Sequence, residues 1–171
     1  MKIQEALVVA DRVLDVLRPV SLRVEVAGSV SRRRTDVGDL EVVCIPGEVA
    51  CPDLFVADAT CRSQAWIRAV DGLGLAVKGD PVSGKYIQVT LAEGINLDLF
   101  LARTVNWGLI LAIRTGSARF SHEVLARGWC AAGYRSSEGM LWAAGRPVPV
   151  REEAELFEKI HQPWVEPRDR E

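Results

Sequence analysis

Apolar residues near the start of the chain recur at helical spacing. They return every three or four positions from Ile3 to Leu17, and Pro19 follows them. This spacing predicts an amphipathic helix that ends before the proline, because proline cannot continue a helix. Residues 22–27 and 39–45 carry runs of Leu, Val and Ile that are typical of strands, and the second, more apolar run is expected to be central. The pattern therefore predicts one helix followed by two strands.

The middle of the chain alternates between turn-rich and apolar segments. Residues 46–60 are rich in turn residues and include Pro52, which favours a loop. A helix is expected over 62–70, and residues 75–78 and 86–91 are expected to form a hairpin with a long loop. Residues 95–101 predict a further strand, with four apolar residues on one face. Asn96 and Asp98 occupy its other face.

Beyond Ala102 the pattern changes, and we expect a boundary between domains 1–102 and 103–171. Thr104 is expected to cap a helix over 107–113, which residues 114–117 break. Ser117 is expected to cap the next helix, with Phe120, Val124 and Leu125 on its inner face. Residues 134–148 predict a small hairpin and 152–160 a short final helix. Helices and strands in this order indicate an α+β fold.

Composition narrows the class of protein. The 171 residues are 49% hydrophobic and 26% charged, and no apolar run approaches the roughly 18 residues that span a bilayer. We therefore expect no membrane association. Residues 1–5 (MKIQE) include an early acidic residue and indicate a helix rather than a signal peptide, so we expect an intracellular location, in the cytoplasm or nucleoid. The four cysteines form no C-x-x-C pair, and Cys44 and Cys130 lie in apolar surroundings typical of buried thiols.

Charge and ligand types point to hard cations. With two histidines in the chain, a zinc site is not expected, and carboxylates favour Mg²⁺ or Mn²⁺. The net charge of −2 argues against a uniformly basic nucleic-acid surface. Residues 1–102 carry a net charge of −3 and residues 103–171 a net charge of +1. Two divalent ions in the first part would reverse its sign, so affinity for a polyanion should depend on metal.

Three carboxylates are the candidate metal ligands. Asp39 and Glu41 project from the same side of their strand, because strand side chains alternate between faces. If the strand that carries Asp98 is their neighbour, the three groups converge and repel one another. A pair of divalent ions would relieve the repulsion. Two ions roughly 3.5–4 Å apart are the arrangement used in nucleotidyl transfer, where one activates the attacking hydroxyl and the other holds the triphosphate.

A Gly-Ser turn before these carboxylates supplies a candidate phosphate site. Gly28 permits close approach of the backbone, and Ser29 offers a hydroxyl and a backbone N–H. Arg32 lies one helical turn further and is suited to bind phosphate oxygens. Gly38 is expected to serve the turn and the entry of substrate. Arg33 and Arg34 are as consistent with solvated surface charge as with a role.

The G-S turn, the D-x-E pair and the later Asp resemble the signature of the nucleotidyltransferase superfamily. Residues 111–120 (LAIRTGSARF) and the tail 163–171 (PWVEPRDRE) make the chain similar to family X DNA polymerases, the DNA polymerase β family. The resemblance implies a palm with a mixed sheet and helices on one face, and a C-terminal α/β thumb-like subdomain that closes over the nucleotide. With 171 residues, the chain is similar in plan to the compact, virus-encoded members of this family.

The resemblance also implies a function. Asp39, Glu41 and Asp98 would be the catalytic residues and the ligands of two Mg²⁺ or Mn²⁺ ions, with Gly28, Ser29, Arg32, Gly38, Gly116 and Ser117 binding a deoxynucleoside triphosphate. For Gly116 and Ser117, a helix-breaking turn and a cap are the alternative. The acceptor would be a DNA primer–template or gapped DNA, extended by a monomeric gap-filling or repair polymerase.

The chain departs from the family at several positions. Glu41 replaces the commoner Asp, and Ile113 and Arg114 stand where the family has aromatic residues beside the sugar. Leu125 stands where an arginine that contacts the template is expected. Two alternatives therefore remain open: template-independent transfer to RNA, a small molecule or a protein, and a nucleotide- or nucleic-acid-binding module without catalysis.

Overall fold

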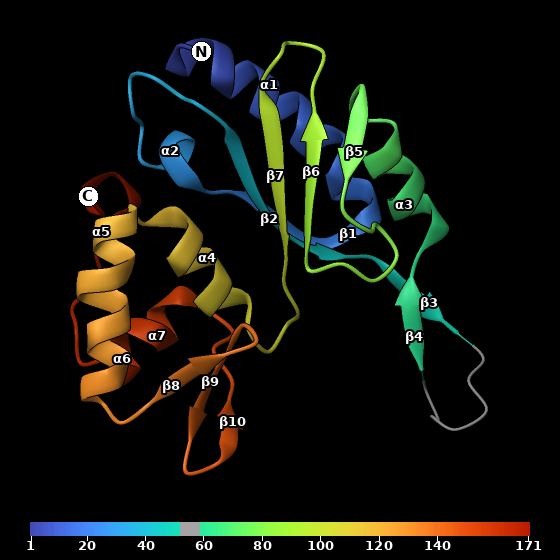
Figure 1. Ribbon diagram of the computed structural model, residues 1–171. Helices are drawn as coiled ribbons and strands as arrows, with labels where there is room; N and C mark the ends of the chain where they lie inside the picture. The colour runs from blue at the N-terminus through green and yellow to red at the C-terminus, as the bar shows by residue number, and fades with distance from the viewer. Residues whose placement is uncertain (52–58) are drawn as a thin grey trace.

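A five-stranded mixed sheet forms the N-terminal part of the protein. The computed structural model describes residues 1–51 and 59–171. The strand order is β1-β2-β7-β6-β5 (Figure 1), with β2 and β7 parallel and the other neighbours antiparallel. The strands are β1 (Ser21–Val26), β2 (Leu40–Pro46), β5 (Ala76–Lys78), β6 (Tyr86–Thr90) and β7 (Asn96–Leu101). The strands expected from the sequence, including the hairpin, are thus confirmed.

Two helices cover one face of this sheet. They are α1 (Ile3–Leu17), which ends at the 3₁₀ turn η1 (Arg18–Val20), and α3 (Gln64–Asp71), which is capped by Ser63. The helix expected to end before Pro19 is therefore confirmed. The core between helices and sheet contains Val13, Leu17, Val42, Trp66, Leu97 and Leu99, all with no exposed surface. Burial of this apolar face fixes which residues of β2 and β7 point the other way.

The other face of the sheet is only partly covered. Helix α4 (Trp107–Thr115) packs Trp107 and Leu111 against Val43 and Ile45 of β2. Residues nearer the start of β2 and β7 on this face, including Glu41 and Asp98, lie outside that apolar contact. The polar side chains of the central strands therefore remain accessible beside α4.

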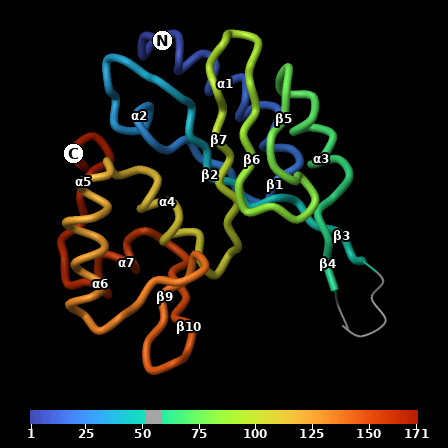
Figure 2. Tube along the Cα trace, viewed as in Figure 1, coloured from blue at the N-terminus to red at the C-terminus, as the bar shows by residue number. Residues whose placement is uncertain are grey.

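The C-terminal part contains a helical layer and a small sheet. Helix α5 (Ala118–Phe120), the π-helical segment η2 (Ser121–Ala126) and α6 (Arg127–Ala131) follow one another directly along the chain, as Figure 2 shows. The antiparallel strands are β8 (Arg135–Ser137), β9 (Met140–Ala143) and β10 (Arg146–Val148), followed by α7 (Glu153–Lys159) and η3 (Pro167–Asp169). The predicted hairpin and final helix are confirmed, and a third strand extends the hairpin.

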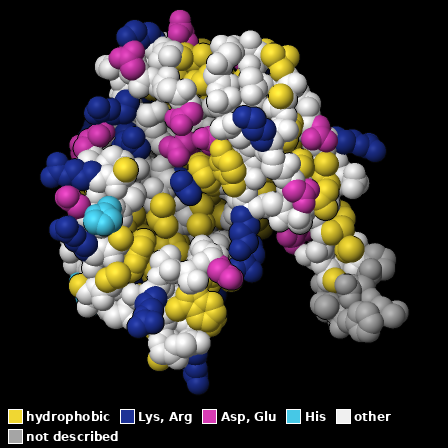
Figure 3. Space-filling view, viewed as in Figure 1, with side chains coloured by type: hydrophobic (Ala, Val, Ile, Leu, Met, Phe, Trp, Pro, Cys, Tyr) yellow, Lys and Arg dark blue, Asp and Glu magenta, His cyan; other side chains and the backbone are white. Residues whose placement is uncertain are grey.

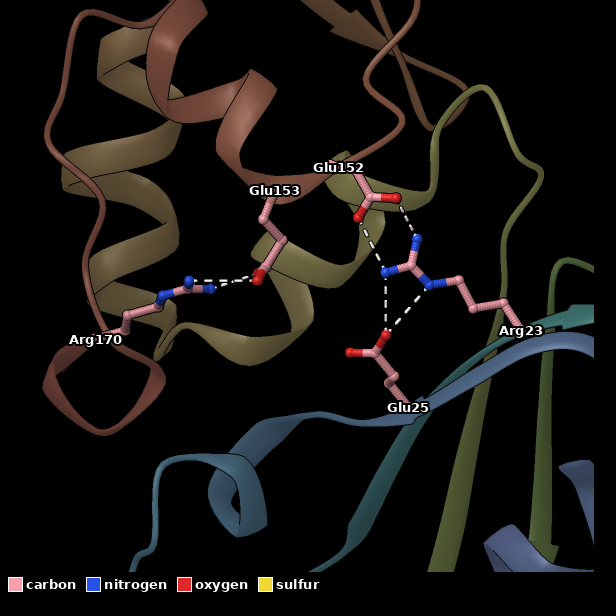
Figure 4. A network of polar contacts seen from close by, with 5 residues as sticks. All are labelled: Arg23, Glu25, Glu152, Glu153 and Arg170. Atoms are coloured by element: carbon pink, nitrogen blue, oxygen red, sulfur yellow. Dashed lines mark hydrogen bonds and ion pairs between the residues drawn. The ribbon is translucent and has the colours of Figure 1, made fainter.

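Two arginine–glutamate clusters hold the C-terminal part in place (Figure 4). Arg23 of β1 donates to both carboxylate oxygens of Glu152, at 2.5 and 2.9 Å, and to Glu25 of its own strand. Its guanidinium also lies 4.4 Å from the ring centre of Trp107. The fully buried Arg170 pairs with Glu153 at 2.5 Å. The first cluster ties the large sheet to the segment before α7, and the second ties the end of the chain to α7.

Several expectations were wrong. Residues 48–50 and Thr60, expected as loop, and Arg62, expected to begin a helix, form the antiparallel ribbon β3 (Glu48–Ala50) and β4 (Thr60–Arg62); Pro52 lies outside the described residues. Thr104 does not cap α4, because Asn106 takes the N-cap position, and Arg114 belongs to the helix. Cys44 is buried as expected, but Cys130 is exposed. These features depend on pairing and packing between segments, which local composition does not reveal.

Among residues 1–51 and 59–171, no helix combines the length and the apolar character needed to cross a membrane.

Candidate active site

A polar row crosses the open face of the sheet. Glu41 of β2 stands directly opposite Asp98 of β7 in parallel register, and Asp98 stands opposite Gln88 of β6 in antiparallel register. Opposite residues of neighbouring strands share a face. Asp39 is exposed just before β2, two residues from Glu41. From the sequence alone, the strands of Glu41 and Asp98 could only be assumed to be neighbours. They are adjacent, and the carboxylates of Glu41 and Asp98 share one face.

Glu41 is in an unfavourable setting for a charge. Burial raises the pKa of its carboxyl to about 7, and the neighbouring charge of Asp39 adds to this effect, with a smaller contribution from Asp98. The cations Arg114 and Arg32 act in the opposite direction. The row thus concentrates negative charge where solvent cannot fully stabilise it.

Asp98 is oriented by its β6 neighbours. The phenolic hydroxyl of Tyr86 donates to Asp98 Oδ1 at 2.7 Å, and Gln88 Nε2 donates to the same oxygen at 2.9 Å. Burial and the adjacent Asp98 charge raise the pKa of Tyr86 to about 12, so the hydroxyl stays protonated as a donor. Within the part of the chain that the structure describes, Asp98 Oδ2 receives no side-chain hydrogen bond. One carboxylate oxygen is therefore fixed and the other is available.

The fit of these residues to metal ions is mixed. Carboxylate oxygens on one face, mutually repelling, suit hard divalent cations. As the side chains lie, however, no group of three or more His, Cys, Asp or Glu among residues 1–51 and 59–171 is arranged to hold an ion. Asp98 is engaged with β6, and the Glu41 carboxyl lies beside Gly28. The residue types and their shared face fit the metal, whereas their side-chain conformations do not bring them together.

The Gly28 turn lies against Glu41. Gly28 begins the short helix α2 (Gly28–Ser31) with a φ of +60°, which L side chains rarely adopt. A Cβ at this position would collide with the carboxyl group of Glu41 and lie 3.0 Å from its Cβ. Glycine is therefore required both by the backbone and by the approach of the carboxylate.

Two buried polar atoms beside this turn lack partners. Ser29 Oγ and Arg32 Nε are buried without a hydrogen bond in the described structure. Such atoms normally find a partner, because an unpaired one costs about 1–3 kcal/mol. Both are donors, so the turn suits an anion with oxygen acceptors, as a phosphate is.

Arg32 also contacts the C-terminal part. Its Nη1 donates to the carbonyl of Thr115 at 2.8 Å, and its Nε lies 3.6 Å from the carboxylate of Glu171, which also pairs with Arg34 at 3.3 Å. The end of the chain thus returns to α2 (Figures 1 and 2). Gly38, by contrast, is exposed and has no atom within 4 Å of where a Cβ would be.

Gly116 and Ser117 form the turn between α4 and α5. Ser117 Oγ accepts from the backbone N–H of Phe120 at 3.0 Å, which confirms the expected cap. A Cβ on Gly116 would lie 2.7 Å from the Phe120 ring. These contacts account for both residues structurally, and a role at the nucleotide sugar stays a prediction.

Sequence reasoning gave no role at the site to Tyr86, Gln88 or Phe100, and named Arg114 only as a departure from the family. Tyr86 stands opposite Phe100, and the Arg114 guanidinium carbon lies 3.7 Å from the Phe100 ring centre. The alternation of β6 does place Tyr86 and Gln88 on its polar face, so a signal existed. Their neighbours across the strand depend on the register, which the sequence did not provide.

A cleft of about 1260 Å³ opens from Asp98 between the sheet and the C-terminal part. Tyr86, Phe100 and Arg114 line it beside Asp98, and Met140 and Trp142 of β9 belong to the opposite wall. Figure 3 shows the hollow, with apolar side chains on its floor and both basic and acidic side chains around it. Asp98 is thus reached from a cleft large enough for an extended ligand, whereas Asp39 and Glu41 are not among its lining residues.

Comparison with known families identifies one part of the chain. The family model of the DNA polymerase beta thumb matches residues 110–171, from within α4 to the last residue. A search of curated proteins gave no match for the chain. The C-terminal part that faces the carboxylate row is therefore similar to the thumb of DNA polymerase beta.

Proposed function

We propose that the protein is a DNA-directed DNA polymerase of the family X type, which adds a deoxynucleotide to a DNA 3′-hydroxyl during gap filling or repair. The observation that carries the proposal is the in-register pair Glu41 and Asp98 on a sheet face that lies beside a polymerase beta-type thumb. The buried donors Ser29 Oγ and Arg32 Nε, which make no hydrogen bond within the described residues, support it, since they suit the triphosphate.

Each residue has a role in the proposed step. Asp39, Glu41 and Asp98 would hold two Mg²⁺ or Mn²⁺ ions, which when bound lower the pKa of the acceptor hydroxyl and stabilise the leaving phosphate. Asp98, whose Oδ2 is available, takes the proton of the 3′-hydroxyl. The 3′-oxygen forms a bond to the α-phosphorus, the bond to the bridging oxygen of the β-phosphate breaks, and pyrophosphate leaves. The Gly28 turn and Arg32 orient the triphosphate.

Primer extension on a gapped duplex tests the proposal. Each deoxynucleotide is supplied singly with Mg²⁺ or Mn²⁺, for the native chain, for Asp98→Ala and for Asp71→Ala as a matched aspartate control outside the site. Templated incorporation that Asp98→Ala reduces at least 1000-fold, and Asp71→Ala leaves unchanged, is the expected result. Untemplated transfer would indicate the alternative acceptors, and DNA binding without transfer would indicate a binding module.

A further inference from the structure

Tyr86, Phe100 and Arg114 form a continuous surface beside Asp98, here called the Tyr86 platform. The Tyr86 and Phe100 rings lie 5.3 Å apart at 36°, and Arg114 reaches over Phe100 from α4. The residues come from two strands of the sheet and from the helix at which the thumb match begins. The platform is thus built where the two parts of the molecule meet, at the wall of the cleft.

The platform presents an exposed aromatic ring and a guanidinium that makes no hydrogen bond within the described residues. Tyr86 is 42% exposed, one of the large apolar side chains left on the surface. Arg114 makes no side-chain hydrogen bond or ion pair with any described residue, although the residue is half-buried and its guanidinium lies against an aromatic ring. An exposed ring and an unpaired, pre-oriented cation are the two features that bind a base or sugar and a phosphate.

The cleft favours an extended acceptor over a compact one. Its volume of about 1260 Å³ exceeds the roughly 300–1,000 Å³ of small-molecule sites. Its lining has more basic than acidic residues, whereas the whole chain has a net charge of −2. The basic residues are Arg62, Lys85, Arg103, Arg114 and Arg151, and the acidic ones are Glu48, Asp98 and Glu138. A positively charged cleft with apolar walls matches a nucleic-acid strand.

We infer that the Tyr86 platform binds the 3′-terminal nucleotide of the DNA acceptor. Its sugar and base pack on Tyr86 and Phe100, and a backbone phosphate binds Arg114. Tyr86 has a second role as a positioning residue, because its hydroxyl holds Asp98 Oδ1 at 2.7 Å and leaves Oδ2 for the 3′-hydroxyl. This inference rests on the proposed function and deepens it, since it assigns the site that selects the acceptor.

Binding in Mg²⁺ without a deoxynucleoside triphosphate separates the platform from catalysis. The probe is a primer–template with 2-aminopurine at the primer 3′ end, and a second probe carries it five nucleotides inward. Tyr86→Leu should raise the Kd for DNA about tenfold and abolish the fluorescence change of the terminal probe alone, because base–aromatic stacking is lost. Tyr86→Phe keeps the ring and should bind as the native chain does. Unchanged binding and fluorescence in Tyr86→Leu would overturn the inference.

A second matched pair of variants tests the contribution of the Arg114 charge to DNA binding. Arg114→Leu should weaken DNA binding and reduce the slope of log Kd against log salt by about one, as expected for one lost phosphate contact. Arg12→Leu, on α1 and paired with Glu93, removes the same charge elsewhere and should leave the slope unchanged. Equal slopes for the native chain and Arg114→Leu would show that Arg114 does not bind a phosphate of the DNA. Circular dichroism and urea unfolding check that each variant is folded.

Kinetic measurements distinguish the stacking role of Tyr86 from its positioning role. They also distinguish failure of the Tyr86 platform from failure of the proposed polymerase function. Tyr86→Phe should lower kcat about tenfold without changing KM for DNA, whereas Tyr86→Leu should change both. Normal KM and kcat in Tyr86→Leu would refute the role of the Tyr86 platform and would leave the polymerase proposal unaffected. Tyr86-dependent binding of the 3′ end in a chain that transfers no nucleotide would support the platform and refute the polymerase.

Discussion

The substitution Gly28→Ala follows directly from the geometry of the phosphate turn. An alanine would have to adopt a φ of +60°, which costs about 1–2 kcal/mol. Its methyl group would also overlap the Glu41 carboxyl and press on the Glu41 Cβ, which is fixed to strand β2. Overpacking of this kind adds about 1–3 kcal/mol. Urea denaturation should therefore show a loss of about 2–5 kcal/mol in the free energy of unfolding.

Gly38→Ala is the matched control, because no atom lies within 4 Å of the added methyl group and its φ is not in the left-handed region. Its effect should stay within about 0.5 kcal/mol. In the Glu41→Ala background the carboxyl overlap is gone but the Cβ of residue 41 remains, so the loss caused by Gly28→Ala should be smaller than in the native chain and should still exceed the backbone cost of about 1–2 kcal/mol. The reasoning is refuted if Gly28→Ala and Gly38→Ala are equally stable, or if removing the Glu41 side chain gives no relief.

Three further predictions concern charged residues. Glu153→Gln leaves the buried Arg170 guanidinium without its carboxylate, and should lower the free energy of unfolding by about 3–5 kcal/mol in urea denaturation; a loss under about 1 kcal/mol would contradict the importance of the pair. Arg23→Leu removes half-exposed ion pairs to Glu152, and should cost about 1 kcal/mol at low salt and less in 1 M NaCl, so equal losses at both would argue against an electrostatic contribution. Because the pKa of Glu41 rises from 4.5 to about 7 on folding, the folded chain holds a proton that the unfolded chain has released between these pH values. The stability of the native chain in EDTA should therefore fall from pH 4.5 to 7, by about 1–2 kcal/mol after allowance for solvent screening, and Glu41→Gln should remove that slope.

Local patterns in the sequence predicted most of the elements. The apolar spacing before Pro19 determined α1, and the alternation in residues 95–101 correctly placed Leu97 and Leu99 inside and Asp98 outside. Such patterns report on the burial of one face, which each segment encodes by itself. The short ribbon of β3 and β4 was missed because three-residue strands carry too little pattern of their own.

The candidate site was only partly predictable, for a physical reason. The spacing of Asp39 and Glu41 predicts a shared face within one strand, whereas β2 begins at Leu40 and Asp39 lies just before it. The position of Glu41 opposite Asp98 depends on the parallel register of β2 and β7. The contacts of Asp98 with Tyr86, and of Arg114 with its ring partner, join segments 12 or more residues apart. These contacts are set by tertiary packing, and the end of α4 was misjudged because Arg114 continues the helix.

Counting bound Mn²⁺ tests the central claim most directly, that carboxylates of β2 and β7 together hold divalent ions for nucleotidyl transfer. Electron paramagnetic resonance of free Mn²⁺ is measured with a primer–template and a non-hydrolysable deoxynucleoside triphosphate. The native chain and Asp71→Ala should each bind about two ions. Asp98→Ala should bind at most one with unchanged affinity. Equal binding of Mn²⁺ by native and Asp98→Ala chains would contradict the proposed site.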